Sequence, residues 1–229
     1  MTAVVWIVKP GDDNEQLRYS LRSVAANLPH TSAWIAGHRP RWVAPDVHHR
    51  PAEHHQGDRH GNVRRNITEA CRSLDRWILA WDDVYVTRPL EQLPVLHAGP
   101  VDDIVARLRE RDGGARSKYA TDIEAAGRIL RTMGIADPRC YDALHVPQTI
   151  HSEHMLQAIR IADHTDTNCI LTLHGNLAQV GGTEHVNAKS ADGWAERILV
   201  STSQLRFDRA PEGQHIRALF PQPCQYEAT

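Results

Sequence analysis

Short apolar runs alternate with helical repeats along the first third of the chain. Residues 3–8 (AVVWIV) form a continuous, β-branched apolar run, which is typical of a strand buried on both faces. After a turn-rich stretch, apolar residues recur at helical spacing until Pro29, namely Leu17, Leu21, Val24 and Leu28. A second short apolar run follows at residues 33–36. This order of strand, helix and strand predicts a βαβ unit with parallel strands.

A third apolar run ends in two adjacent carboxylates. Residues 44–61 are rich in histidine, proline and glycine and predict a loop, whereas residues 62–75 repeat their apolar positions at helical spacing. The run from Trp77 to Trp81 then predicts a third core strand, and Asp82 and Asp83 follow it directly. Ligands of open α/β sheets bind outside the carboxyl ends of the strands, so we expect chemistry at this pair.

The pattern is less regular in the second half of the chain. The apolar run at residues 169–173 (CILTL) predicts a fourth strand. Helical repeats predict three further helices, over residues 101–111, 121–133 and 152–162. We therefore expect an α/β fold with a mixed, mostly parallel sheet flanked by helices. It would occupy residues 1–205 as a single domain that can carry a small subdomain, and residues 206–229 would form an irregular tail.

Composition places the chain among ordinary soluble domains. Its 229 residues are 41% hydrophobic and 24% charged, which suits one folded core and argues against extensive disorder. A formal net charge of −2 provides no general attraction to nucleic acid or anionic membrane. No apolar run approaches the ~20 residues of a membrane span, and no basic leader precedes the first strand. Four widely spaced cysteines predict free thiols in a reducing compartment, so we expect a cytoplasmic protein.

Two adjacent aspartates at the end of a buried strand need compensation for their charge. Hard oxygen ligands suit Mg²⁺ or Mn²⁺, and such an ion can bridge a nucleotide diphosphate and stabilise the negative charge of the leaving group. The alternative is a strand-ending turn in which one aspartate accepts hydrogen bonds from backbone N–H groups. The pair alone leaves both interpretations open.

The histidine-rich loop at residues 48–55 (HHRPAEHH) raises the question of a zinc site. A helical HxxEH arrangement would need a histidine at Arg50, and Pro51 would interrupt the helix that presents both ligands. A solvated loop is the better interpretation.

Four other motifs accompany the aspartate pair. EQLRYSLRSV at residues 15–24 leads to GHRPRW at residues 37–42, and GNVRRN at residues 61–66 precedes the aspartate strand. The later motifs are HVP at residues 145–147 and HGN at residues 174–176, which is followed by VNAK at residues 186–189. In this order, over residues 4–190, they resemble glycosyltransferases and sugar-phosphate transferases related to the Stealth family. The chain departs from that pattern at His174, where tyrosine is expected, and at Asn187, where aspartate is expected.

The resemblance implies a GT-A-like (Rossmann-type) fold, a nucleotide-sugar donor, with a UDP-sugar favoured, and Mn²⁺ or Mg²⁺ held by Asp82 and Asp83. The implied catalytic residues are Asp83 and His145, of which His145 is a metal ligand, a base or an acceptor contact. For Arg18 and Lys189, a solvated surface side chain is an equally good interpretation, and for Arg65 an exposed basic helix face is nearly as good. The implied donor contacts are Lys9, Pro10, Asp12, Arg18, Asn62, Arg65, Asn176 and Lys189.

The expected reaction is attack by a hydroxyl of a protein or glycan acceptor on the anomeric carbon of the donor sugar. The nearest alternative is transfer of a sugar 1-phosphate, which uses a similar donor and metal but breaks the other phosphate linkage. An alternative of another class is a non-enzymatic nucleotide- or carbohydrate-binding module. Small members of this group are carried by phages and bacteria, so we expect the cytoplasm of a bacterial or phage-infected cell.

Overall fold

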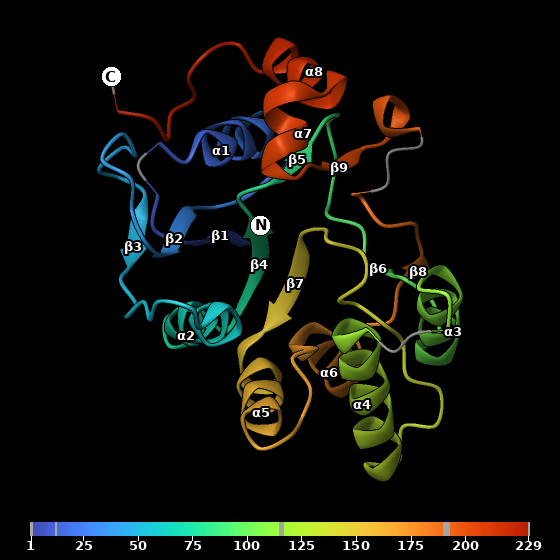
Figure 1. Ribbon diagram of the computed structural model, residues 1–229. Coiled ribbons are helices and arrows are strands. Elements are labelled where there is room, and N and C mark those ends of the chain that lie inside the picture. The colour runs from blue at the N-terminus through green and yellow to red at the C-terminus, as the bar shows by residue number, and fades with distance from the viewer. Residues whose placement is uncertain (1, 12, 115–116, 190–192, 229) are drawn as a thin grey trace. The chain divides into compact units, whose positions relative to one another are not determined.

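The chain folds into two compact units. The computed structural model describes residues 2–11, 13–114, 117–189 and 193–228 (Figure 1). The first unit comprises Met1–Leu93, His145–Thr149 and Ala188–Thr229, and the second comprises Pro94–Leu144 and Ile150–Asn187. Each unit is therefore assembled from segments that are distant in the sequence.

A five-stranded sheet forms the core of the first unit. Its order is β3-β2-β1-β4-β7, and the pairs β1–β2, β1–β4 and β2–β3 are parallel. All six residues of β1 are buried, which explains why the central strand reads as a continuous apolar run. The strands are β1 (Ala3–Val8), β2 (Ala33–Gly37), β3 (His48–Arg50), β4 (Arg76–Trp81) and β7 (Gln148–His151).

Two helices cover this sheet. α1 (Glu15–Asn27) and α2 (Arg59–Cys71) lie on opposite sides of β1 and β2 (Figure 1). The apolar face of α1 is fully buried, with Leu17 and Leu21 at 0% exposure. The structure thus confirms the predicted βαβ unit of β1, α1 and β2, and it also confirms the predicted helix α2 and strand β4 that follow. The structure adds β3, a short edge strand within the region expected to be a loop.

The C-terminal residues are helical, in contrast to the irregular tail that we expected. α7 (Gln204–Arg209) is followed by α8 (Pro211–Leu219), which has proline in its first turn. Phe207, Ile216 and Phe220 form one apolar cluster with Tyr85. The helices are short and depend on this packing, which is why their own sequence predicts them poorly. Tyr85 belongs to β5 (Val84–Val86), which pairs antiparallel with β9 (Leu199–Ser201); the 3-10 turn η1 (Trp194–Glu196) precedes β9.

The second unit is mostly helical. It contains α3 (Val101–Arg111), α4 (Lys118–Thr132), α5 (Ser152–Asp163) and α6 (Ile170–Leu177). A two-stranded parallel sheet joins β6 (Leu96–His97) and β8 (Thr183–Glu184). The three predicted helices are confirmed. No helix in the described part of the chain is long and apolar enough to cross a membrane.

The predicted fourth strand at residues 169–173 is wrong, because this segment begins α6. All residues from Ile170 to Gly175 are buried, so the helix has no polar face and its apolar run lacks helical periodicity. Asp142 accepts a hydrogen bond from the backbone N–H of Thr172 at 2.7 Å, in the first turn of the helix. A buried helix of this length and a buried strand have the same sequence pattern.

Candidate functional site

Asp82 and Asp83 form the turn between β4 and β5 in the first unit. β4 lies on one side of β1 and β2 lies on the other. After β1, the chain forms β2 and β3 on one side of β1, and it then crosses to the other side of β1 to form β4. Such a switch point is the usual ligand site of an open α/β sheet.

Asp83 is held by one imidazole and one ammonium group. Nε2 of His145 lies 2.7 Å from Oδ1 of Asp83, and Nζ of Lys189 lies 3.0 Å from Oδ2. Burial acts to raise the pKa of Asp83, but the hydrogen bond and charge of His145 and the charge of Lys189 outweigh it and hold the pKa below its ordinary value. Three segments separated by more than 40 residues thus converge on one carboxylate.

His145 is placed by both its ring and its backbone. The ring stacks on Trp81, the last residue of β4, with centroids 5.6 Å apart and planes 13° apart. The φ of His145 is 51°, in the left-handed region that a non-glycine residue adopts at a cost of about 1–3 kcal/mol. With Nε2 donating to Asp83, the neutral ring has its lone pair on Nδ1. The strain and the fixed tautomer are features of a residue positioned for chemistry.

Asp82 has a different environment. Burial, and then the negative charge of Asp83, raises the pKa of Asp82, against opposing effects of which Lys9 is the largest. Within the described chain, the Asp82 carboxylate forms no ion pair at 4.0 Å or less. A hard divalent cation would compensate this charge, so Asp82 suits the role of a metal ligand. Asp83 fits less well, because each of its oxygens already accepts a bond from His145 or Lys189.

A group of three or more His, Cys, Asp or Glu side chains arranged to hold a metal ion does not occur among the described residues. The metal, if bound, would therefore depend on Asp82 together with oxygens from water or from a bound phosphate.

Buried polar contacts fix the backbone beside Asp83. The N–H of Thr202 donates to the carbonyl of Asp83 at 3.1 Å. Nε2 of Gln16 donates to the Thr202 hydroxyl at 2.9 Å and to the Tyr85 hydroxyl at 3.3 Å. Gln16, Tyr85 and Thr202 are all buried, so this network restrains the turn from within the protein.

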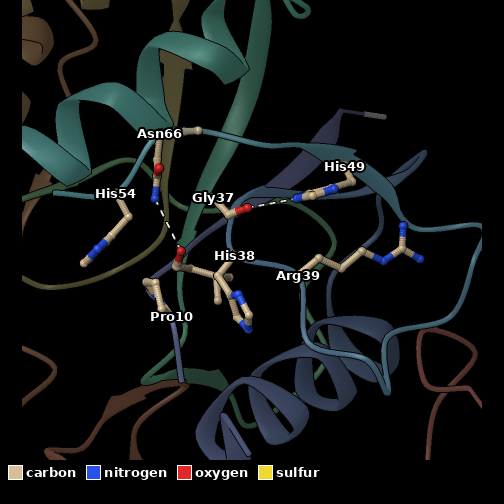
Figure 2. A pocket seen from close by; sticks show the side chains of 9 residues that line it. Pro10, Gly37, His38, Arg39, His49, His54 and Asn66 are labelled. Carbon is tan, nitrogen blue, oxygen red and sulfur yellow. Dashed lines mark hydrogen bonds between the residues drawn. The ribbon is translucent and has the colours of Figure 1, made fainter. Parts of the chain in front are cut away.

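A pocket of about 330 Å³ opens at the carboxyl ends of β1 and β2. Figure 2 shows His38 beside Pro10, and His54 on the side of Asn66. Asn66 donates to the carbonyl of Val8 at 3.4 Å, and Nε2 of His49 lies 2.9 Å from the carbonyl of Gly37. The lining residues are Val8, Pro10, Gly37, His38, Arg39, His49, Ala52, His54 and Asn66.

The pocket lies at the carboxyl end of β1, and the aspartate turn follows the carboxyl end of the neighbouring strand β4. Pro10 lines the pocket, and the neighbouring Lys9 acts electrostatically on Asp82. The pocket is lined by the imidazole groups of His38, His49 and His54 and the amide of Asn66, together with apolar residues that include Val8 and Ala52.

Several of the other predicted donor contacts have structural partners. Arg18 lies 3.1 Å from Glu227 and stacks over Trp42, and Asn176 bonds the backbone of Arg139 in the second unit. Asn62 exchanges two hydrogen bonds with the backbone of His55, and Arg65 binds Glu53, Asp58 and Asn62. These two residues hold the loop beside α2. Asp12 lies outside the described residues.

The sequence interpretation did not assign the pocket histidines to a site. His38 follows the carboxyl end of β2, so the rule that singled out Asp82 also applies to it. His49 and His54 were interpreted as solvated loop residues, because their approach to β1 and α2 depends on the fold. Gln16 and Thr202 carry no local signal at all, since 186 residues separate them.

No protein-family model matches the chain, and no curated protein sequence matches it significantly.

Proposed function

We propose that the chain is a nucleotide-sugar-dependent glycosyltransferase with a GT-A-like fold. The convergence of Asp83, His145 and Lys189 carries this proposal. The sequence motifs singled out these three residues separately, and their contacts are 2.7 and 3.0 Å. Convergence of an acid, a base and a cation at the switch point of the sheet supports a reaction site.

The donor nucleotide occupies the pocket and the edge beside it in this proposal. Its base lies among His38, His49 and Asn66, which offer ring and amide groups for hydrogen bonds. Its diphosphate extends past Pro10 to Lys9 and Lys189, which neutralise its charge. A volume of about 330 Å³ suits a base and ribose and leaves the phosphates outside.

His145 acts as the general base of the reaction. Asp83 orients the ring through Nε2 and stabilises the imidazolium that forms when Nδ1 takes the proton of the acceptor hydroxyl. Lys189 then faces the leaving phosphate, where a cation favours departure of a diphosphate. A Mn²⁺ or Mg²⁺ ion bound through Asp82 would supply further neutralisation of the diphosphate.

Transfer of a sugar 1-phosphate is the nearest second candidate, because it needs the same base and the same cations. Incubation with UDP-sugars and Mn²⁺ separates the two reactions. Release of UDP indicates glycosyl transfer, and release of UMP indicates phosphate transfer. The acceptor is a hydroxyl of a protein or glycan in both cases.

The variants Asp83→Asn, His145→Asn and Lys189→Met test the enzyme proposal. Each should lower turnover by about a hundredfold, the size expected for loss of one positioned group. Arg72→Met serves as the control, because Arg72 is an exposed side chain that pairs with Glu69 on α2 and belongs to neither the cluster nor the pocket. The proposal fails if the three cluster variants retain full metal-dependent turnover. A non-enzymatic binding module instead predicts donor binding without metal and without any effect of Asp83→Ala.

A further inference from the structure

One buried hydroxyl joins the two ends of the aspartate turn. Ser20 lies on α1 and is fully buried. Its Oγ lies 2.7 Å from the carbonyl oxygen of Val84 and 3.0 Å from that of Trp81. These carbonyls belong to the residues immediately before and after the Asp82–Asp83 pair. The hydroxyl thus acts on both ends of the turn that carries the two carboxylates.

The orientation of the Ser20 hydroxyl is itself restrained. Nε1 of Trp6 donates to Oγ of Ser20 at 2.9 Å, and Trp6 is also fully buried. This bond occupies an acceptor lone pair and leaves the single hydroxyl proton facing the turn. Trp6 lies on β1 opposite Ala80 of β4, so the contact connects the central strand to the end of its neighbour.

A third carbonyl, that of Asp83, accepts a hydrogen bond from the N–H of Thr202. Three of the four carbonyl groups from Trp81 to Val84 therefore have fixed partners outside the turn. A shift of this backbone moves both carboxylates, because each side chain is short and is attached directly to the turn.

We infer that Ser20 is a positioning residue for the Asp82–Asp83 pair. It acts through the backbone carbonyls of Trp81 and Val84 and touches no reacting group. The inference rests on the proposed function for its kinetic consequence only. A displacement of the turn by a fraction of an ångström would lengthen the Asp83–His145 contact and reduce the rate of the chemical step.

Ser23 provides a matched control on the same helix. It is also fully buried, its Oγ donates to the carbonyl of Ser20 at 2.8 Å, and it accepts from the N–H of Val86 at 3.1 Å. It therefore supports β5 without touching the carbonyls that flank the aspartates. Ser20→Ala and Ser23→Ala each remove one buried hydroxyl from α1.

The first measurement is amide hydrogen exchange in the substrate-free protein, which is independent of the proposed reaction. Ser20→Ala should accelerate exchange at the amide of Thr202, which donates to the Asp83 carbonyl, by about tenfold, the effect of losing one hydrogen bond that holds the turn. Ser23→Ala should act on Val86 instead. The inference is overturned if both variants accelerate exchange at the same amides, or if Ser20→Ala leaves exchange at the amide of Thr202 unchanged.

The second measurement is the kinetics of UDP release from a UDP-sugar with Mn²⁺. Ser20→Ala should lower kcat about tenfold to a hundredfold with little change in KM, because it displaces reacting groups and spares the pocket. Ser23→Ala should retain the kcat of the wild type, and Ser20→Thr, which keeps the hydroxyl, should restore most of it. Equal losses in Ser20→Ala and Ser23→Ala would reject the positioning role. If the wild type releases no UDP or UMP, the proposed function fails and the exchange experiment still decides the role of Ser20.

Discussion

Glu227 closes the C-terminal segment onto α1 through an almost fully buried carboxylate. Its side chain is 2% exposed. Oε1 accepts from Nε of Arg22 at 2.6 Å, and Oε2 accepts from Nη2 of Arg22 at 2.8 Å and from Nη1 of Arg18 at 3.1 Å. The side chain of Arg22 is only 10% exposed. Replacement of Glu227 by glutamine keeps the shape of the side chain and leaves this guanidinium without its counter-charge.

The cost follows from burial. Removal of one partner from a buried pair destabilises by about 3–5 kcal/mol, because the other charge stays buried without compensation. Glu15 provides the comparison, because it accepts the same two-pronged bond from Arg217, with both contacts at 3.0 Å. Glu15 and Arg217 are 34% and 30% exposed, so water screens them and Glu15→Gln should cost about 1 kcal/mol or less.

Urea denaturation at neutral pH measures both variants against the wild type. We expect Glu227→Gln to lower the free energy of unfolding by about 2 kcal/mol or more beyond Glu15→Gln. Release of the segment would also accelerate exchange at the amide of Ala228, which donates to the carbonyl of Trp42 at 2.7 Å. Equal costs for the two variants would refute the reasoning that burial decides the strength of these pairs.

The same pair has a pH signature. Burial acts to raise the pKa of Glu227, but the hydrogen bond and charge of Arg22 hold it below the ordinary value of 4.5. The carboxylate therefore contributes stability above pH 4.5, and this contribution is lost as the pH falls towards the lowered pKa of the folded state. Glu227→Gln should accordingly show a weaker loss of stability between neutral pH and pH 3 than the wild type.

Three other outcomes are expected. Gly37→Ala should lower the free energy of unfolding by about 2–5 kcal/mol, because φ is 103° and the new Cβ would lie 2.4 Å from the Val8 carbonyl oxygen. Gly57→Ala should lower it by about 1–2 kcal/mol, because φ is 81° but the new Cβ would lie in open space. Equal costs for the two variants in urea denaturation would contradict this prediction. Burial, and then the charges of two nearby histidines, lowers the pKa of His174 to about 3. As the pH falls, His174 therefore takes up a proton in the unfolded chain before it does so in the folded protein. The wild type should lose about 2 kcal/mol of stability between pH 7.5 and 5.0 for this reason. An equal loss in His174→Gln would exclude His174 as its source. Lys189→Met should weaken binding of UDP in a titration without metal, whereas Lys118→Met, a change in the second unit, should not.

The turn at Asp82 and Asp83 was predictable, since it depends on local pattern. A buried parallel strand is a continuous apolar run, and its end is marked where polar residues begin. The motifs also selected His145 and Lys189, although no local feature of the sequence relates their positions to Asp83. Their contact with Asp83 depends on the path of the chain between them.

The errors have the same origin. Residues 169–173 were predicted as a strand because a helix buried on all sides loses its amphipathic repeat. The helices after residue 203 were not predicted because each is short and depends on the cluster of Phe207, Ile216 and Phe220. Arg18 stays a predicted donor contact, and its ion pair with Glu227 could not be predicted, because Glu227 lies 209 residues further along the chain.

The local pattern of the amino-acid sequence specifies β1, β2, β4, α1 and α2 of the first unit and the position of its two aspartates, because these depend on the periodicity of apolar residues over short distances. Tertiary structure alone decided which groups meet at those aspartates. The bonds of Asp83 to His145 and Lys189, the contact of Ser20 with the turn and the pocket around His38 all join segments that are distant in the chain. Side chains from such segments acquire their partners and their shifted pKa values only when the sheet and its helices bring them together.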